Sequence, residues 1–384
     1  MMRKCNVCNS SDIQPFFESG GKYSLTTMNK MIEGKTVVSY CSNCDHLQTD
    51  ELPNLIEFYA DDYEINVNSS DDDQLYAIID GKEIYRSEHE ASVLADKINL
   101  KTHKNVLDFG CAKAPTLLKL LDIEADVKPF LFDVTDKYVS YWEQFPKSTE
   151  WCTHTLNPEW ADKMDVVLSF FALEHIPNLS EILVEVKNVL RDGGIFCFLV
   201  PNILKNPGDF VVVDHVNHFS KSSILQMMTR AGFCEIEIDD DAYKAAFVVR
   251  AKVDKSAIPE DIQITPELES IGLELASFWG GVKGRIQSFE ADLPEDSLCA
   301  IYGAGFYGNF VFSCLKEPER VVCFLDQNKF LAGGKNHGIP VYKPAEMPEE
   351  INALFAGINP KSARGIISQV PIIEDSGIPI FFFE

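Results

Sequence analysis

The sequence predicts an α/β protein with two mostly parallel sheets and a small cysteine-bearing segment near its N-terminus. The first sheet is indicated by apolar runs separated by helical segments, NVLDFG, KPFLFDV, DVVLSFF and GIFCFLVP, and by a closing pair, EIEIDD and AAFVVRAK. Apolar strands that alternate with helices are typical of parallel sheets with both faces covered. The same rhythm returns near the C-terminus in SLCAIYGAG, RVVCFLD, ALFAGI and PIFFFE.

This pattern and the length of 384 residues predict three segments, because a chain of this length is too long for one domain with a single hydrophobic core. Residues 1–55 are expected to form the cysteine-bearing module, 56–254 the first α/β domain, and 255–384 a linker helix with the second α/β domain. The linker helix is expected over residues 267–290, after the proline- and acid-rich join DKSAIPEDIQITPELES. Helices are also expected in NLIEFYADDYE and KEIYRSEHEASVLADKI, with an acidic segment between them as a lid.

The composition is that of a globular protein with an acidic balance. Hydrophobic residues make up 46% of the chain, charged residues 24%, and the formal net charge is −25. Because affinity for a phosphate backbone comes from clustered Lys and Arg, we expect no nucleic-acid partner. The sequence has no apolar run of about 18 residues, and its start, MMRKCNVCNS, lacks the apolar stretch of a secretory signal. We therefore expect no membrane association and a cytoplasmic location.

Four cysteines in two pairs predict a structural zinc site. Cys5 and Cys8 form one Cys-x-x-Cys turn, and Cys41 and Cys44 form the other. Each turn presents two thiolates on one side, and two such turns complete the tetrahedral shell of Zn²⁺ with no position left open. Four unrelated thiols or a redox pair are the alternatives, although a redox pair needs a βαβ context that this segment lacks.

The first strand of the middle domain leads into a loop suited to a nucleotide. Asp108 and Gly110 end the run NVLDFG, and glycine at such a turn lets the backbone bend sharply and approach a ligand. Residues 112 and 114 are alanines. We expect both to have a negative φ, because a positive φ costs an alanine on the order of 1 kcal/mol. The next strand ends at Asp133, whose carboxylate can accept hydrogen bonds from both ribose hydroxyls.

A second glycine loop follows the first strand of the C-terminal domain. It reads Gly303-Ala304-Gly305-Phe306-Tyr307-Gly308, and the next strand ends at Asp326. This fits the dinucleotide fingerprint and supports an NAD-dependent oxidoreductase as a rival function. Only about 80 residues follow the loop, too few for a full dinucleotide fold and a catalytic domain. A cofactor-free unit that binds a nucleotide diphosphate or only packs is therefore favoured.

The ordered motifs of the middle domain resemble those of the class I S-adenosylmethionine (SAM)-dependent methyltransferases. The set comprises the Asp-x-Gly loop, the acid after the second strand, DVVLSFFALEHI and VLRDGGIFCFLVPN. The resemblance implies SAM as cofactor and a Rossmann-like fold. It assigns the methionine part to Asp108, Gly110 and Ala112, and the ribose to Asp133. It assigns the wall near the methyl group to Phe171, Ala172, Leu173 and Glu174, for which packing is the alternative role.

Over nearly its full length the chain resembles nucleotide-sugar C-methyltransferases, which have a four-cysteine zinc module, a methyltransferase domain and a C-terminal Rossmann-like domain in this order. In that family a base after the fifth strand deprotonates a carbon beside a keto group, and the sugar is carried on a nucleoside diphosphate. The corresponding segment here is DFVVVDHVNHFS. The resemblance assigns the base to His215 and its orienting acid to Asp214, which stands where the family has Glu.

Two departures from the family pattern bear on the reaction. Val212 replaces a Tyr whose hydroxyl could hold or protonate an enolate, and His218 replaces an aromatic residue before Phe219. Without that hydroxyl, we favour methylation of a sugar oxygen, which needs only a base and in-line alignment; carbon methylation is the alternative. His218 is either a buried stand-in for the aromatic residue or, with Asp214 and His215, part of a divalent-ion site that acidifies the hydroxyl.

Three further residues are candidate substrate contacts. His175 touches the substrate or caps a helix. Asn202 matches a family position that lines the acceptor pocket, with a loop amide as its alternative partner, and Tyr63 closes over the cofactor or packs in the core. The expected function is therefore SAM-dependent methylation of a nucleotide-linked sugar, with His215 as general base. A chain whose altered loop has lost the cofactor would instead be a nucleotide-sugar-binding scaffold.

Overall fold

The computed structural model describes residues 3–20, 22–51, 73–257, 262–263 and 265–384. The chain forms two compact units, of which the first comprises Met1–Pro15, Val38–Lys205 and Asp214–Ile271, and the second comprises Phe16–Val37, Asn206–Val213 and Gly272–Glu384. This division cuts across the predicted segments 1–55, 56–254 and 255–384. Both cysteine pairs belong to the same unit as the middle sheet, and two short segments from earlier in the chain belong to the C-terminal unit.

The first unit is built on a seven-stranded sheet with the order β10-β9-β8-β11-β12-β15-β14. Its strands are β8 (Asn105–Phe109), β9 (Lys128–Asp133), β10 (Glu150–Thr153), β11 (Met164–Phe170), β12 (Leu190–Pro201), β14 (Phe233–Asp239) and β15 (Ala246–Val253). The strands from β10 to β12 are parallel, and β15 runs antiparallel to both β12 and β14. The predicted parallel sheet with a closing pair is confirmed.

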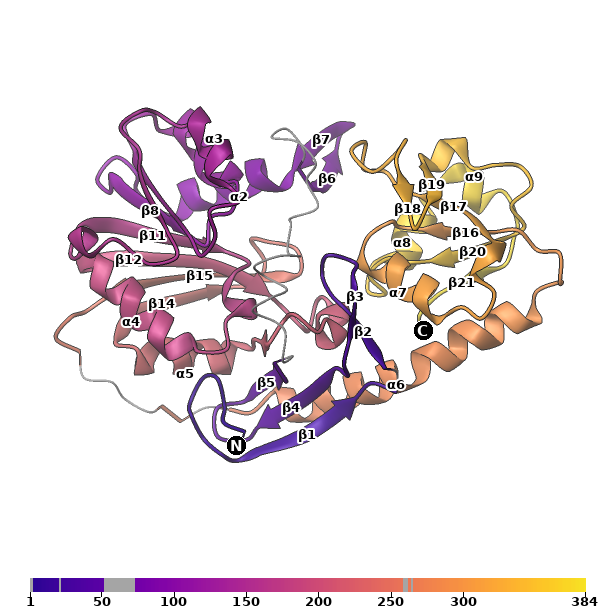
Figure 1. Cartoon of the computed structure of the whole chain (residues 1–384), viewed down its shortest axis with the longest axis horizontal. Coiled ribbons are helices and arrows are strands. Elements are labelled where there is room, and N and C mark those ends of the chain that lie inside the picture. The colour runs from indigo at the N-terminus through magenta and orange to yellow at the C-terminus, as the bar shows by residue number, and fades with distance from the viewer. Residues whose placement is uncertain (1–2, 21, 52–72, 258–261, 264) are drawn as a thin grey trace. The chain divides into compact units, whose positions relative to one another are not determined.

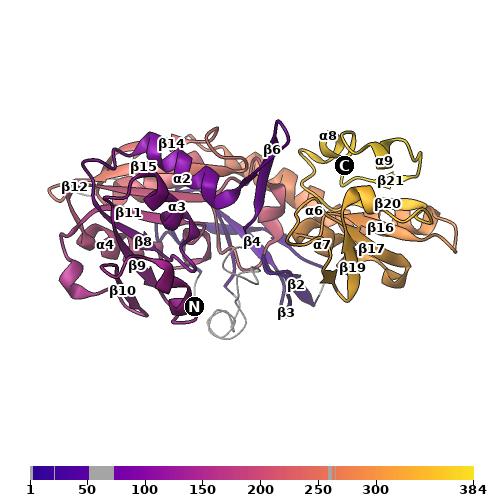
Figure 2. The ribbon, with the colours of Figure 1, turned by 90° about the horizontal axis from the view of Figure 1, so that it is seen from above.

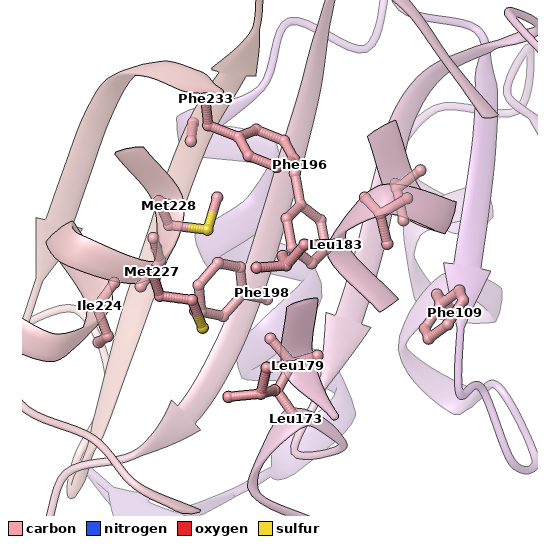
Figure 3. Close-up of a cluster of buried hydrophobic side chains, with 14 of the residues drawn as sticks. Phe109, Leu173, Leu179, Leu183, Phe196, Phe198, Ile224, Met227, Met228 and Phe233 are labelled. Atoms are coloured by element: carbon pink, nitrogen blue, oxygen red, sulfur yellow. The ribbon is translucent and has the colours of Figure 1, made fainter. Parts of the chain in front are cut away.

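Helices cover both faces of this sheet because successive side chains of each strand enter two different buried clusters. In β12, Phe196 and Phe198 join the cluster that includes Leu183 of α4 (Leu179–Val189) and Met227 of α5 (Lys221–Arg230). Figure 3 shows these side chains packed together. Cys197 joins the other cluster, with side chains of α2 (Arg86–Lys97) and α3 (Pro115–Ile123). The two helix pairs accordingly lie on opposite sides of the strands (Figure 1).

The helix predicted over KEIYRSEHEASVLADKI begins later than expected. Lys82–Tyr85 forms strand β7, which pairs with β6 (Leu75–Ile79), and α2 begins at Arg86. The turn between these strands is Asp80-Gly81, with φ of +50° and +78°. Asp-Gly between apolar runs is a strong signal for a tight hairpin, and it overrides the helical periodicity here. The helix predicted in NLIEFYADDYE and most of the acidic lid lie outside the described residues.

The cysteine pairs border a four-stranded sheet with the order β1-β4-β5-β13. These strands are β1 (Ile13–Glu18), β4 (Val37–Cys41), β5 (His46–Thr49) and β13 (Asn217–His218). β5 pairs antiparallel with both β4 and β13. Because β13 belongs to the segment that follows β12, the segment predicted to carry the base is joined by backbone pairing to the cysteine-bearing segment.

The second unit is built on a six-stranded sheet with the order β18-β19-β17-β16-β20-β21. Strands β19, β17, β16, β20 and β21 can be followed in Figure 2. Its strands are β16 (Cys299–Tyr302), β17 (Val321–Leu325), β18 (Lys335–Asn336), β19 (Ile339–Tyr342), β20 (Ala353–Ala356) and β21 (Ile380–Phe381). All of these strands except β18 pair in parallel.

The further strands and α-helices of the described residues are short, apart from one long helix. They are β2 (Tyr23–Leu25), β3 (Met31–Glu33), α6 (Leu268–Asp292), α7 (Phe306–Cys314), α8 (Ala363–Ile367) and α9 (Pro371–Glu374). The bounds of α6 agree with the helix predicted over residues 267–290. Among the described residues, no helix combines the length and the apolar character that crossing a membrane requires.

Candidate active site

The loop after β8 has left-handed backbone at three positions. The φ angle is +71° at Gly110, +46° at Ala112 and +53° at Ala114. The alanines therefore do not adopt the negative φ that suits them, and left-handed backbone costs an alanine about 1–2 kcal/mol. Hydrogen bonds hold the loop in this form: Ala112 donates its N–H to Asp133 Oδ2 at 2.8 Å, and its carbonyl accepts from Trp142 Nε1 at 2.7 Å. Both alanines thus have the backbone geometry for which glycine is usually used.

Gly110 is required by its surroundings as well as by its φ. A Cβ at this position would lie 3.1 Å from the Cβ of Ala172, in the turn that follows β11. The first predicted cofactor segment and the predicted wall segment therefore approach each other closely. Parallel strands explain this, because β8 and β11 are neighbours and their carboxyl ends meet at one edge of the sheet.

The turn after β11 carries the predicted wall residues Phe171, Ala172, Leu173 and Glu174. Phe171 has a φ of +50° and donates its N–H to the carbonyl of Leu199 at 2.9 Å. A short 3₁₀ helix, η4 (Leu173–His175), follows. Leu173 and Glu174 are both buried, so a hydrophobic and an acidic side chain point into the protein at this edge.

Asn217 holds this turn, and sequence analysis missed it. Its Nδ2 donates to the carbonyls of Leu173 at 2.9 Å and Ile176 at 2.7 Å. Its Oδ1 accepts from Asn6 Nδ2 at 3.0 Å and lies 3.2 Å from His46 Nε2. The side chain is fully buried, so these hydrogen bonds satisfy an amide that would otherwise be costly to bury. Asn217 therefore joins the cysteine-bearing segment to the wall turn.

Asp133 lies at the end of β9, as predicted for the acid that meets the ribose. Its Oδ2 accepts from the N–H of Ala112, and its Oδ1 accepts from the N–H of Thr135 at 3.1 Å. Burial raises its pKa above the usual range of a carboxyl group, although these amide hydrogen bonds favour the charged form. A carboxylate oxygen can accept more than one hydrogen bond, so this arrangement is compatible with a role at the ribose hydroxyls. That role stays a prediction.

Asp108 is a buried acid at this edge of the sheet. It is 2% exposed, and its Oδ1 has no hydrogen-bond partner within the described part of the chain. Burial raises its pKa well above the usual range, and the charges of Glu90 and Asp133 raise it further. A buried carboxylate oxygen without a partner is costly unless a cation or donor faces it. This orphaned oxygen, beside a loop with glycine geometry, fits the cationic amino group of SAM.

Two histidines and an acid come together beside the wall turn. Ligand-type atoms of Glu174, His175 and His215 lie within 4.8 Å of one another, and the two imidazole rings meet edge-on with centroids 4.7 Å apart. His175 Nδ1 lies 2.8 Å from the carbonyl oxygen of Asp214. Because a carbonyl only accepts, Nδ1 carries the hydrogen and the lone pair of a neutral His175 is on Nε2. The Asp214 carboxylate is fully buried and lies 3.8 Å from His175 Nδ1.

His218 takes a different place from the other candidate catalytic residues. It is fully buried in β13, and its Nε2 lies 2.7 Å from Thr49 Oγ1. The structure therefore does not gather the predicted ion-binding set of Asp214, His215 and His218; the histidine beside His215 is His175. The pairing of β13 with β5 is the cause, because it draws residue 218 into the sheet of the cysteine-bearing segment.

The remaining predicted positions have mainly structural contacts. Asn202 Oδ1 accepts from the N–H of Leu204 at 3.0 Å, which is the loop-amide role considered as its alternative. Ser220, the last residue of the segment DFVVVDHVNHFS, caps α5. Its hydroxyl accepts from the N–H of Ser223, and the hydroxyl of Ser223 accepts from the N–H of Ser220. Tyr63 lies outside the described residues.

The four predicted metal ligands form a single buried cluster. Cys5 Sγ lies 3.4 Å from Cys44 Sγ, and Cys8 Sγ lies 3.6 Å from Cys41 Sγ. All four sulfurs lie within 4.8 Å of one another, and none is in a disulfide. Tetrahedral ligands about 2.3 Å from a zinc ion are about 3.8 Å apart, so the cluster has close to the required dimensions.

The second glycine loop, in the C-terminal unit, repeats one feature of the first. Ala304 donates its N–H to Asp326 Oδ2 at 2.9 Å, as Ala112 does to Asp133. Its glycines also have a packing reason: a Cβ at Gly308 would lie 1.9 Å from the carbonyl oxygen of Gly303. Close contact between helix and strand therefore accounts for this pair of glycines without a bound dinucleotide.

Comparison with known families agrees with this site. Residues 83–237 match the family model described as "Methyltransferase domain". The matched segment includes the cofactor loop, Asp133 and the wall turn. Over this segment, which is less than half of the chain, the protein is similar to a methyltransferase domain. A search of curated proteins gives no match.

Solved structures with a related fold share little sequence with this chain. The CurJ carbon methyltransferase is 14% identical, with 44% of this chain and 54% of that chain covered and a TM-score of 0.36. Human N-acetylserotonin methyltransferase in complex with SAM is 10% identical, with 43% and 52% covered and a TM-score of 0.38. A SAM-dependent methyltransferase from Mesorhizobium loti is 15% identical, with 43% and 97% covered and a TM-score of 0.35. The chain thus spans about half the length of the first two.

Substitution of the orphaned carboxylate tests the charge assignment at the loop. We expect Asp108→Asn to raise the free energy of unfolding at neutral pH by about 1 kcal/mol or more, because it removes a buried charge without a partner. A raised pKa means that the folded chain holds a proton that the unfolded chain has lost. The wild-type protein therefore loses stability as pH rises above the usual Asp range. The difference in free energy of unfolding between Asp108→Asn and the wild type should become smaller towards about pH 4.

Urea unfolding at several pH values measures this gap. Asp126→Asn, at an exposed position, is the control, and a gap that does not change with pH would contradict the assignment.

Proposed function

We propose that the protein is a SAM-dependent methyltransferase that methylates a hydroxyl oxygen of a nucleotide-linked sugar, with His215 as the general base. The observation that carries this proposal is the cluster of Glu174, His175 and His215 directly after the wall turn. This cluster and the cofactor loop occupy the carboxyl edge of the same sheet, which is where ligands bind in parallel sheets. The resemblance of the whole chain to nucleotide-sugar methyltransferases supports the choice of acceptor.

The chain's own residues supply the proton chemistry of this reaction. Bound SAM supplies a methyl carbon attached to a positively charged sulfur. His215 is buried and meets the ring of His175, which the carbonyl of Asp214 holds in one orientation. A neutral histidine near pH 7 accepts the hydroxyl proton as the new C–O bond forms and the C–S bond breaks. The nearby carboxylates of Glu174 and Asp214 stabilise the imidazolium that results.

The choice of oxygen over carbon rests on the residues after β12. Val212 stands in sequence where the related C-methyltransferases have a Tyr, so no hydroxyl from this position can hold an enolate. Methylation of a hydroxyl needs a base and in-line alignment but no enolate. Carbon methylation of a nucleotide-linked keto-sugar is the second candidate, because the whole-chain resemblance is to enzymes of that type.

A panel of acceptors tests the proposed function. We expect methyl-labelled SAM to give a singly methylated product with at least one nucleotide-linked sugar, detected by mass spectrometry. Loss of an exchangeable O–H proton in the product identifies oxygen methylation, and a new C–C bond seen by NMR identifies carbon methylation. Labelling of free sugars but of no nucleotide-linked sugar would contradict the proposal.

Replacement of the base gives a second expected outcome. We expect His215→Ala to lower kcat by about 10²–10⁴-fold, because a general base typically contributes that much. Calorimetric SAM binding should stay close to that of the wild-type protein, which shows that the variant is folded. His103→Ala is the matched control, because this histidine precedes β8 and contacts Asn99 at the amino edge of the sheet. Turnover of His215→Ala within a few-fold of wild type would remove His215 from the mechanism.

We also propose that the four-cysteine cluster holds one structural Zn²⁺. Besides the sulfur distances, N–H groups face two of the sulfurs: Val7 N lies 3.4 Å from Cys5 Sγ, and Asn43 Nδ2 lies 3.4 Å from Cys8 Sγ. Such donors stabilise thiolates that bind a metal. With all four ligands from the protein, the ion would have no open position and no direct part in the reaction.

Removal of one zinc ligand should affect the cofactor site as well as the metal. We expect one zinc per wild-type chain by elemental analysis and none in Cys44→Ser, with a loss of folding stability, because the free energy of metal binding is part of folding. SAM affinity should fall too, since Asn6 and His46 flank the cluster and hold Asn217. Cys234→Ser, outside the cluster, should keep its zinc and its SAM affinity. A Cys44→Ser chain with wild-type stability would contradict the proposal.

A further inference from the structure

The second glycine loop has no part in the proposed reaction so far, and its backbone is held by side chains of its own unit. The carbonyl of Ala304 accepts from Asn309 Nδ2 at 3.1 Å and from Asn336 Nδ2 at 3.2 Å. The carbonyl of Gly305 accepts from Asn309 Nδ2 at 2.8 Å. These internal hydrogen bonds fix the loop, so that a side chain on the loop has a defined position.

Tyr307, a residue of this loop, binds a segment from earlier in the chain. Its hydroxyl donates to Asn206 Oδ1 at 2.6 Å and accepts from the N–H of Gly208 at 2.7 Å. Tyr307 is buried, so water competes little for these bonds. Trp279 of α6 donates its Nε1 to the carbonyl of Pro207 at 2.8 Å. Two aromatic side chains therefore hold consecutive residues of one segment.

The segment also fits closely against the ring of Tyr307. A Cβ on Gly208 would lie 2.6 Å from Cζ of Tyr307. The ring has further neighbours, because its centroid lies 5.6 Å from that of Phe383 and 6.4 Å from that of Trp279. A larger residue at 208 would therefore have to displace either a packed ring or the segment itself.

The held segment leads directly to the proposed base. It continues as η5 (Pro207–Val211), a short 3₁₀ helix whose residues are all buried. The whole segment Asn206–Val213 belongs to the second unit together with Tyr307. His215 follows two residues after its end. Because the backbone is continuous, the position of η5 limits where the His215 side chain can lie.

We propose that Tyr307 is a positioning residue for the general base, and that this is what the second glycine loop contributes to the reaction. The hydroxyl of Tyr307 holds the start of the segment that carries His215 and exchanges no proton with the substrate. The inference rests on the proposed function, because it acts through His215. A base that is out of line lowers the rate of the chemical step even where the ligands still bind.

A purely structural role of Tyr307 is the rival interpretation. The segment has other holds, since Trp279 binds its start and the N–H of Val213 donates to the carbonyl of Leu25 at 3.1 Å. If these contacts suffice, loss of the Tyr307 hydroxyl changes the stability of the protein and leaves the base in place.

Tyr307→Phe tests the inference, because it removes the hydroxyl and keeps the ring. With an acceptor identified in the panel, we expect kcat to fall by about 10- to 100-fold and calorimetric SAM affinity to stay within about twofold of wild type. Hydrogen exchange followed by mass spectrometry should become faster in residues 206–215. The NMR signal of the His215 ring, assigned with His215→Ala, should shift. All measurements use the zinc-replete full-length chain.

Two matched variants separate the position of the base from general stability. Tyr302→Phe, at another buried tyrosine of the second unit, should change neither kcat, nor the exchange of residues 206–215, nor the His215 signal. Gly208→Ala keeps the hydroxyl but crowds the ring, and it should lower kcat and speed local exchange as Tyr307→Phe does.

The contrary outcomes are distinct from failure of the proposed function. Turnover of Tyr307→Phe within a few-fold of wild type would overturn the inference, as would equal effects of Tyr307→Phe and Tyr302→Phe. A wild-type chain that methylates no acceptor would contradict the proposed function. In that case, unchanged exchange and an unchanged His215 signal in Tyr307→Phe would still overturn the inference, and a change in both would support it.

Discussion

The hydrogen bond from the N–H of Ala112 to the carboxylate of Asp133 is the constraint on which the cofactor site depends. It joins the loop after β8 to the end of β9, and it holds an alanine in backbone that alanine disfavours. The left-handed turn keeps the loop close to the wall turn, where a Cβ on Gly110 would lie 3.1 Å from the Cβ of Ala172. The same bond turns the carboxylate of Asp133 towards the loop. One acid thus both shapes the loop and is positioned for a ligand bound over it.

A second constraint comes from outside the parallel sheet. The wall turn contains Glu174 and His175, and Asn217 holds it through the carbonyls on either side of these residues. Asn217 is itself fixed by Asn6 and His46, next to the cysteine turns. The cysteine-bearing segment is therefore connected to the candidate active site through one buried amide. This connection is a physical reason for the cysteine-bearing segment and the wall turn to belong to the same compact unit.

Features governed by local sequence could be predicted, and features governed by distant pairing could not. The apolar runs gave the parallel strands, and the carboxyl ends of such strands meet at one edge, so Asp108, Gly110 and Asp133 come together as predicted. The burial of His218 agrees with its predicted role as a buried stand-in and not with the predicted ion-binding set, because a two-residue strand pairs with β5, about 170 positions earlier in the chain. Asn217 was missed because an amide has no local sequence pattern that reveals its partner. The hairpin before α2 did have a signal, Asp80-Gly81, which the helical periodicity concealed.

Charge at the catalytic edge links stability to ligand binding. Asp108, Asp133, Glu90, Glu174 and Asp214 are all buried there, while Arg86 is the cation that contacts the wall. Hydrogen bonds satisfy both oxygens of Asp133 and of Glu90, but one oxygen of Asp108 has no such partner among the described residues. Such an oxygen costs folding free energy in the ligand-free state. A ligand with a positive charge at that point recovers this cost on binding, and because it binds only the folded chain, it stabilises the fold as well. The unpartnered oxygen of Asp108 therefore lowers the stability of the ligand-free fold, and a positively charged ligand at this edge would offset that loss.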